Sequence, residues 1–201
     1  MSRYAAIEGV DGAGKSTVAS GVAVAFERRG IEVVRVREPG GTPAGEAIRS
    51  ILLGNTSELA DWTEALLFAA ARSQLANSIV APALGAGKTV ISDRSVYSSL
   101  AYQGAGRGLD LEAVRRVNEA GLGGVWPDTV ILLRLDPDHG LAREDEADRI
   151  SLAGADLHRR VAEAYGRLAA AEPDLFVVID AAGSVDEVVG AALAALESRW
   201  W

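Results

Sequence analysis

Short apolar runs alternate with longer amphipathic segments along the whole chain. The apolar runs predict five strands, at residues 4–7, 31–36, 89–93, 129–135 and 175–179. The helical spacing of apolar positions between them predicts helices at residues 16–29, 44–53, 58–84, 96–103, 111–120, 156–171 and 185–199, and Pro137 opens a further one. Continuous apolar strands that alternate with helices are typical of a parallel sheet covered on both faces.

The loop at residues 9–17 reads Gly-Val-Asp-Gly-Ala-Gly-Lys-Ser-Thr and fits the phosphate-binding pattern G-x-x-x-x-G-K-[ST]. It lies between a predicted strand and a predicted helix, so backbone N–H groups and the positive helix end point at one anion. Lys15 is expected to reach the β- and γ-phosphates of ATP, and the Ser16 hydroxyl to bind Mg²⁺. The residues expected to bind ATP are Gly12, Ala13, Gly14, Lys15, Ser16 and Thr17.

A single domain over residues 1–201 accounts for the pattern, since neither a break in composition nor an internal repeat divides the chain. The expected fold class is α/β: a three-layer P-loop NTPase fold with a five-stranded parallel sheet flanked by helices. Its phosphate site is expected at the carboxyl ends of the strands.

Composition narrows the classes of protein that remain. A net charge of −8 argues against a nucleic-acid-binding protein. The chain has no cysteine, which excludes disulfides and thiolate metal sites, and no apolar run long enough for a membrane span. The first predicted strand begins so near Met1 that no room remains for a signal peptide, and we expect a cytoplasmic protein.

An acid ends the third predicted strand. Asp93 occupies the position from which a carboxylate holds Mg²⁺ through water, although acids also end strands without this role. Arg94 follows it, and no N-K-x-D motif follows the later strands, which counts against a GTPase. Guanidinium groups bind phosphate in a bidentate manner, so an excess of arginines at the predicted site edges suggests a second, phosphorylated substrate. These arginines are Arg37, Arg49, Arg72 and Arg94.

Several segments together resemble the bacterial thymidylate kinases, in the order in which that family has them. They are Arg-Glu-Pro-Gly-Gly-Thr-Pro at 37–43, Leu-Phe-Ala-Ala-Ala-Arg at 67–72, Asp-Arg-Ser at 93–95, Ser-Ser-Leu-Ala-Tyr-Gln-Gly at 98–104, Pro-Asp at 127–128 and Asp-Arg-Ile at 148–150. The resemblance covers nearly the whole chain and implies an enzyme that phosphorylates dTMP to dTDP with ATP and Mg²⁺. It also implies a homodimer, for which the apolar helix at residues 64–84 is a candidate face.

The resemblance implies roles at the acceptor base and sugar. Phe68 would stack on thymine and Arg72 would hydrogen-bond the base, and their spacing puts both on one helical face. Ser99 and Gln103 would meet the base edge, and Tyr102 would lie beneath the sugar, where its ring would block a 2′-hydroxyl. From the residues alone, Phe68 reads as core, Arg72 as a solvated charge and Tyr102 as half-buried packing.

Further roles are implied around the acceptor phosphate. Asp11, inside the P-loop, would contact the 3′-hydroxyl of dTMP. Arg94 and Arg49 would hold the acceptor phosphate, with Arg37 and Glu38 lining the same side.

A lid is expected at about residues 141–150, and its composition departs from the arginine-rich pattern of the family. Some relatives carry an arginine in the P-loop where this chain has Gly12, and others supply one from the lid. Here the lid holds two arginines, Arg143 and Arg149, among four acids. Arg149 is the favoured catalytic arginine because it belongs to the Asp-Arg-Ile segment, and we expect it to cover the β- and γ-phosphates.

Two other functions remain open at this point. One is a nucleoside monophosphate kinase for UMP, CMP or a purine nucleotide, and the other is a non-catalytic regulatory module that binds nucleotide. His139 and His158 have no companions at metal-ligand spacing and read as packing or solvated residues. Trp200 and Trp201 are expected to cover either a core edge or a subunit contact.

Overall fold

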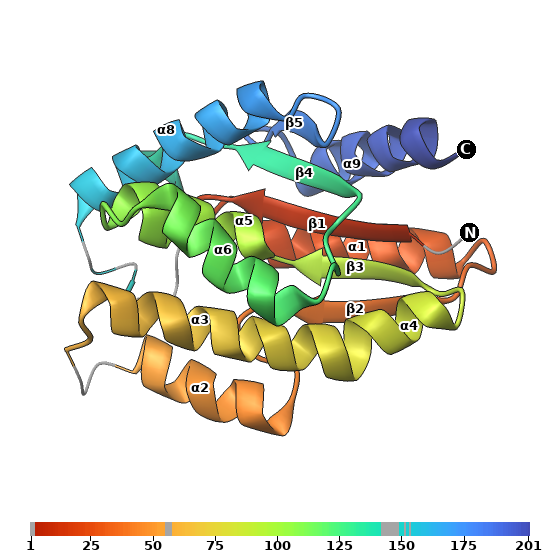
Figure 1. Cartoon of the computed structure of the whole chain (residues 1–201). Coiled ribbons are helices and arrows are strands. Elements are labelled where there is room, and N and C mark those ends of the chain that lie inside the picture. The colour runs from red at the N-terminus through yellow and green to blue at the C-terminus, as the bar shows by residue number, and fades with distance from the viewer. Residues whose placement is uncertain (1–2, 55–57, 142–148, 151, 153) are drawn as a thin grey trace.

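The computed structural model describes residues 3–54, 58–141, 149–150, 152 and 154–201. Within these residues, one sheet of five parallel strands runs in the order β2-β3-β1-β4-β5 (Figure 1). The strands are β1 (Arg3–Gly9), β2 (Val33–Arg37), β3 (Thr89–Asp93), β4 (Thr129–Arg134) and β5 (Phe176–Asp180). The predicted α/β fold class is therefore confirmed.

Helices cover both faces of the sheet (Figure 1). Helices α1 (Lys15–Glu27) and α9 (Val185–Trp200) pack on each other and on one face. The other face carries α3 (Asp61–Leu75), α4 (Ala81–Gly85), α5 (Val96–Ser99), α6 (Leu111–Leu122) and α8 (Ala155–Ala171). Helix α2 (Pro43–Leu53) packs on α3, and α7 (Pro137–Leu141) follows β4. None of the described helices is long and apolar enough to cross a bilayer.

Two predicted α-helices contain wider, π-helical turns. The segment predicted as one helix at 58–84 begins at Asp61 and changes to a π-helix over Ala76–Val80 before α4. Pro82 explains the change, because it has no N–H and its ring collides with the preceding turn of a regular α-helix. The helix that begins at Val96 likewise continues as a π-helix over Leu100–Gly106, beside the pocket described below.

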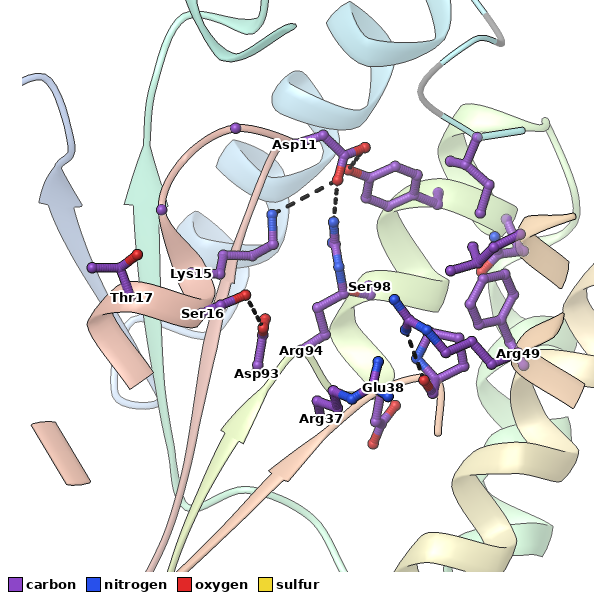
Figure 2. Close-up of a pocket in the computed structure, with 18 residues that line it drawn as sticks. Asp11, Lys15, Ser16, Thr17, Arg37, Glu38, Arg49, Asp93, Arg94 and Ser98 are labelled. Atoms are coloured by element: carbon purple, nitrogen blue, oxygen red, sulfur yellow. Dashed lines mark hydrogen bonds and ion pairs between the residues drawn. The ribbon is translucent and has the colours of Figure 1, made fainter. Parts of the chain in front are cut away.

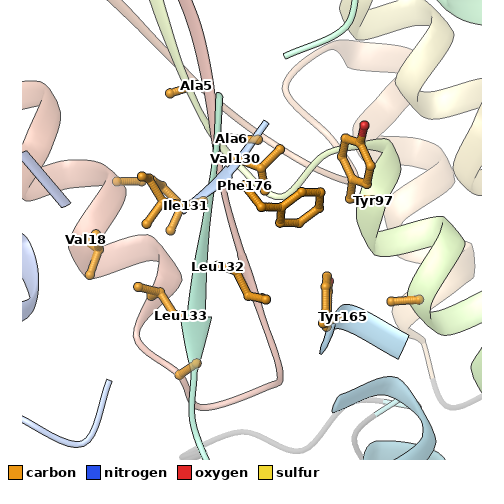
Figure 3. Packing of buried hydrophobic residues seen from close by; sticks show 14 of the residues in the cluster. Ala5, Ala6, Val18, Tyr97, Val130, Ile131, Leu132, Leu133, Tyr165 and Phe176 are labelled. Atoms are coloured by element: carbon orange, nitrogen blue, oxygen red, sulfur yellow. The ribbon is translucent and has the colours of Figure 1, made fainter. Parts of the chain in front are cut away.

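The central strands are buried on both faces, which explains their continuous apolar sequence. Ala5, Ala6 and Ile7 of β1 are fully buried. Figure 3 shows β4 side chains beside the rings of Tyr97 and Phe176, which meet edge to face with centroids 4.9 Å apart. This core fixes the strand ends from which the functional loops leave.

The strand register brings polar residues to one edge of the sheet. Asp93 lies opposite Ile7 on one side and Arg37 on the other. Strand β1 ends at Gly9, where residues 9–17 begin. The phosphate-binding loop and the segments after β2 and β3 therefore leave the sheet side by side.

The two C-terminal tryptophans have different environments. Trp200 is 6% exposed, stacks on Phe26, and donates a 3.1 Å hydrogen bond from Nε1 to Asp128. Trp201 is 72% exposed and meets Phe26 only through a ring edge. The pair was expected to cover either a core edge or a subunit contact, and Trp200 covers a core edge.

We expect Trp200→Ala to lower the free energy of unfolding by about 3–5 kcal/mol, because it empties a large buried site and removes a buried hydrogen bond. Trp201→Ala is the matched control and should cost less than about 1 kcal/mol. Urea unfolding followed by circular dichroism measures both, and equal losses would contradict the burial of Trp200.

Candidate nucleotide-binding site

The loop after β1 has the backbone of a phosphate cradle. Gly12 and Gly14 have φ of 73° and 85°, values that L side chains rarely adopt. Helix α1 begins at Lys15, so the first N–H groups of the helix face the loop. Lys15 Nζ is buried and donates to Val10 O at 2.7 Å. Burial, together with nearby Arg94, lowers the pKa of Lys15 to about 8 despite the opposing charges of Asp11 and Asp93.

Gly12 also has a steric reason to be glycine. A Cβ on this residue would lie 1.9 Å from the carbonyl oxygen of Gly140 in α7, and a Cβ on Gly140 would lie 2.2 Å from Asp11 O. The two backbones therefore touch. The arginine that some relatives carry in the P-loop does not fit here while α7 keeps this position.

Asp11 lies at the centre of a charged cluster (Figure 2). Its Oδ1 accepts from Arg94 Nη2 and lies 3.8 Å from Lys15 Nζ. Its Oδ2 accepts from the Tyr102 hydroxyl at 2.9 Å and lies 3.8 Å from Nδ1 of His158. Burial alone would raise the pKa of Asp11, but Arg94, Lys15 and Tyr102 outweigh it and hold this pKa below its ordinary value.

Ser16 and Asp93 form the place where a divalent cation could be held. Ser16 Oγ donates to Asp93 Oδ2 at 2.5 Å (Figure 2). Among the described residues, no three histidines or acids gather into a metal cage. Mg²⁺ does not need one, because it keeps several waters and takes few protein ligands besides phosphate oxygens. A hydroxyl from the P-loop and a carboxylate from the end of β3 fit that ion.

A pocket of about 440 Å³ joins this cradle to the segments after β2 and β3. It brings together most of the residues singled out from the sequence. Those that line it are Asp11, Gly12, Gly14, Lys15, Ser16, Thr17, Arg37, Glu38, Arg49, Phe68, Asp93, Arg94, Tyr102 and Gln103. Phe68 is 8% exposed and contributes an apolar wall.

The cationic side of the pocket is held by its own hydrogen bonds. Arg94 has φ of 73°, donates to Ser98 Oγ at 3.2 Å, and lies over the ring of Tyr102. Arg49 donates to Pro39 O at 2.9 Å. Arg37 pairs at 3.0 Å with Glu46, which is exposed. A positive φ on a residue other than glycine is typical of a functional constraint, and here it turns Arg94 toward Asp11.

Arg72 and Ser99 lie behind the pocket wall and bind each other. Arg72 Nε donates to Glu38 at 2.6 Å, and Nη1 donates to Ser99 Oγ at 3.0 Å and to Asn118 Oδ1. Burial raises the pKa of Glu38 even though the neighbouring Arg72 opposes the change. From the sequence alone, Arg72 reads as a solvated charge, but in the structure it forms a buried ion pair with Glu38. Asn118 was not expected in this network, because an isolated amide in a helix carries no local signal.

Glu8 is another residue of the site that the sequence motifs do not mark. This carboxylate is fully buried in β1 and accepts 2.7 Å hydrogen bonds from Ser95 N, Ser95 Oγ, Ser98 Oγ and Tyr165 OH. It holds the start of α5, and with it Arg94, against the central strand. The available signal was an acid inside an otherwise apolar run. His158, expected to be a packing or a solvated residue, is buried at 1% exposed, and its Nδ1 lies 3.8 Å from Oδ2 of Asp11.

The expected lid lies mostly outside the described residues, and Arg143 with it. Arg149 is described, and its guanidinium contacts α2 and α3. Its Nε donates to Leu52 O at 2.8 Å, and its Nη2 lies 2.7 Å from Oε2 of Glu64. The next residue, Ile150, is buried and lines the pocket. The donor-side role expected for Arg149 would require the pair with Glu64 to break.

Comparison with known proteins gives a consistent result. The profile of the thymidylate kinase family matches residues 7–191. The thymidylate kinase of Synechococcus sp. (strain JA-3-3Ab) is 42% identical over 196 residues, which cover 98% of this chain and 96% of that protein. The thymidylate kinase of Deinococcus radiodurans is 41% identical over 199 residues, with 98% and 97% covered.

A solved structure extends the likeness to the whole fold. The crystal structure of thymidylate kinase from Ehrlichia chaffeensis matches with a TM-score of 0.80 at 28% identity, and the match covers 97% of this chain and 98% of that one. With its phosphate cradle, its arginine-lined pocket and these full-length matches, the chain belongs to the thymidylate kinase family.

Proposed function

We propose that this protein transfers the γ-phosphoryl group of ATP to dTMP and releases dTDP and ADP, with Mg²⁺ as cofactor. The observation that carries the proposal is one pocket lined both by the phosphate cradle and by three arginines, Arg37, Arg49 and Arg94, with Arg94 bound to Asp11 (Figure 2). A phosphoryl group bound in the cradle would point at an acceptor phosphate held by the arginines.

The donor half of the pocket binds ATP. The backbone of residues 12–17 surrounds the phosphates, and Lys15 supplies a positive charge at the β- and γ-phosphates. Ser16 would bind Mg²⁺ directly and Asp93 through water, and the ion would supply the charge that offsets the triphosphate. Lys15 and these two residues keep the transferring group in line with the acceptor.

The acceptor half of the pocket binds dTMP. Arg94, Arg49 and Arg37 line it, and their guanidinium groups would hold the acceptor phosphate. Phe68 provides the apolar face for thymine, and Gln103 the polar edge. When a phosphate draws Arg94 away, Asp11 becomes free to accept from the 3′-hydroxyl.

Asp11 and Tyr102 are joined at the sugar position. The hydroxyl of Tyr102 donates to Asp11 at 2.9 Å, so one side chain sets the place of the other. The Tyr102 ring, 5% exposed, forms the wall where a 2′-hydroxyl would have to fit. Preference for a deoxyribose then follows from shape.

We also propose a homodimer. Trp62 and Leu66 of α3, one helical turn apart, are 39% and 51% exposed. Together they give this helix an apolar outer surface close to the expected dimer face, and a partner that covers them would remove it from water.

The proposed activity is tested with a coupled assay across dTMP, dUMP, dCMP, UMP and dGMP. We expect dTMP to be the best acceptor and Lys15→Ala to be inactive while its circular dichroism spectrum is unchanged. If UMP, dCMP or dGMP is the better substrate, the proposed acceptor dTMP is wrong. If the protein binds ATP but phosphorylates none of these nucleotides, the result favours a non-catalytic regulatory module.

The pKa of Lys15 predicts a pH limit. Because burial lowers this pKa to about 8, the ammonium that binds phosphate loses its proton above that pH. We therefore expect kcat/KM for ATP to fall up to about tenfold per pH unit above about pH 8. The control is Lys15→Arg, whose guanidinium stays charged, and its slower reaction should show no such fall. A wild-type profile that is flat to pH 9.5 would contradict the assignment.

Arg94 and Arg149 are expected to differ in kinetics. Arg94→Ala should lower kcat by about 10²–10³-fold, because Arg94 lies beside Asp11 and Lys15 where charge develops. Arg149→Ala should mainly raise KM for dTMP, because Arg149 contacts Leu52 and Glu64. Steady-state kinetics with both substrates separates the two effects. A 10²-fold loss of kcat in Arg149→Ala would instead place this arginine at the donor phosphates.

A further inference from the structure

A second buried acid, Glu64 of α3, lies behind the acceptor pocket. Its side chain is 2% exposed, and its Oε1 accepts from Gln103 Nε2 at 2.9 Å. Arg107 Nη2 donates to Oε2 at 3.1 Å, and Arg149 Nη2 lies 2.7 Å from the same oxygen. The carboxylate thus joins α3 to the segment at residues 103–107 and to Arg149, which are far apart in the sequence.

The surroundings of Glu64 keep it ionised. Burial by itself would raise the pKa of this carboxyl, but hydrogen bonds from Arg107, Gln103 and Arg149 outweigh burial and lower the pKa below its ordinary value. An ionised carboxylate only accepts hydrogen bonds. Whatever group faces Glu64 must therefore be a donor.

This requirement decides the orientation of the Gln103 amide. An amide carries a donor end, Nε2, and an acceptor end, Oε1, which point in different directions. With Nε2 bound to Glu64, rotating the amide by half a turn would set Oε1 against a carboxylate oxygen. Gln103 lines the pocket, so Oε1 is the end left to face a ligand there.

Arg72 is not placed to contact the base in the way that Gln103 is. Its guanidinium donates to Glu38, Ser99 and Asn118, and also to Ser95 O. Both side chains are almost fully buried, Arg72 at 2% and Gln103 at 1% exposed, but Gln103 lines the pocket and Arg72 does not.

We infer that Glu64 is a positioning residue for acceptor specificity: it fixes the Gln103 amide so that the pocket presents a hydrogen-bond acceptor to the base. The inference rests on the proposed function and names its chemistry. Thymine and uracil carry an N–H at N3, which can donate to Oε1. Cytosine carries a bare acceptor nitrogen at N3, which Oε1 would repel. The device selects pyrimidines that have the N3 proton.

The test is Glu64→Gln assayed with dTMP, dUMP and dCMP. A neutral amide at residue 64 can accept or donate, so Gln103 becomes free to turn its Nε2 toward the pocket. We expect the ratio of kcat/KM for dTMP to that for dCMP to fall about tenfold, the effect of one hydrogen bond. The ratio for dTMP to dUMP should stay within twofold, because both bases carry the N3 proton. General damage to the fold would move both ratios or neither.

The matched control is Glu172→Gln, which removes a carboxylate that also binds an arginine and a hydroxyl, those of Arg115 and Tyr97. It should leave both ratios unchanged. If Glu64→Gln does not fold, Glu64→Asp keeps the charge for the arginines but withdraws the oxygens from Gln103, and the same change in the dCMP ratio is expected. On the wild-type protein, dTMP methylated at N3 should bind at least tenfold more weakly than dTMP in calorimetry.

The outcomes separate the inference from the function on which it rests. A wild-type protein that does not phosphorylate dTMP defeats the proposed function. An active wild type whose folded Glu64 variants keep the dTMP-to-dCMP ratio overturns the role of Glu64. Tight binding of the N3-methylated nucleotide by the wild type overturns it as well, without any variant.

Discussion

The buried carboxylate of Glu8 is the constraint from which the arrangement of the pocket follows. A charged group in a dry core costs several kcal/mol unless hydrogen bonds satisfy it. Ser95 and Ser98 supply them from the start of α5, and Tyr165 supplies one from α8. These elements are distant in the sequence, so satisfying one oxygen pair brings them to the central strand. Arg94 is carried along, since it immediately precedes Ser95 and is held by Ser98.

Acids and arginines are paired in the pocket and behind its wall, in a chain whose net charge is −8. Glu38 with Arg72 is a fully buried pair, and Asp11 with Arg94 and Glu64 with Arg149 and Arg107 are partly buried pairs. Arginines crowded into one pocket would repel each other, and the acids offset that repulsion while no anion is bound. The pairs also fix each guanidinium in place, so little reorganisation is left for the moment when a phosphate enters. At Arg94, an entering phosphate must compete with Asp11, which is then released for its own role.

The sequence predicts those features of the fold and the site whose signal lies within one short segment of the chain. Residues 89–93 were predicted as a strand and form β3 as such, because a short apolar run between turn signals needs no distant partner. The loop at residues 9–17 is likewise complete within itself. Glu8 and Glu64 have no such local signal, because the role of a buried acid depends on hydrogen-bond donors that only the fold brings to it. Arg149 shows the same limit: the sequence places it near the pocket, but its partner on α3 decides on which side it lies.

The contact between Gly12 and Gly140 is a constraint that the backbone itself imposes on the pocket. A side chain at residue 12 and α7 in its present position exclude each other, because a Cβ there would lie 1.9 Å from Gly140 O. An arginine in the P-loop would therefore need a different path for the chain after β4. Without one, the charge that develops between donor and acceptor has to be offset from another element. Arg94, which directly follows β3 and donates to Asp11, is placed to do so.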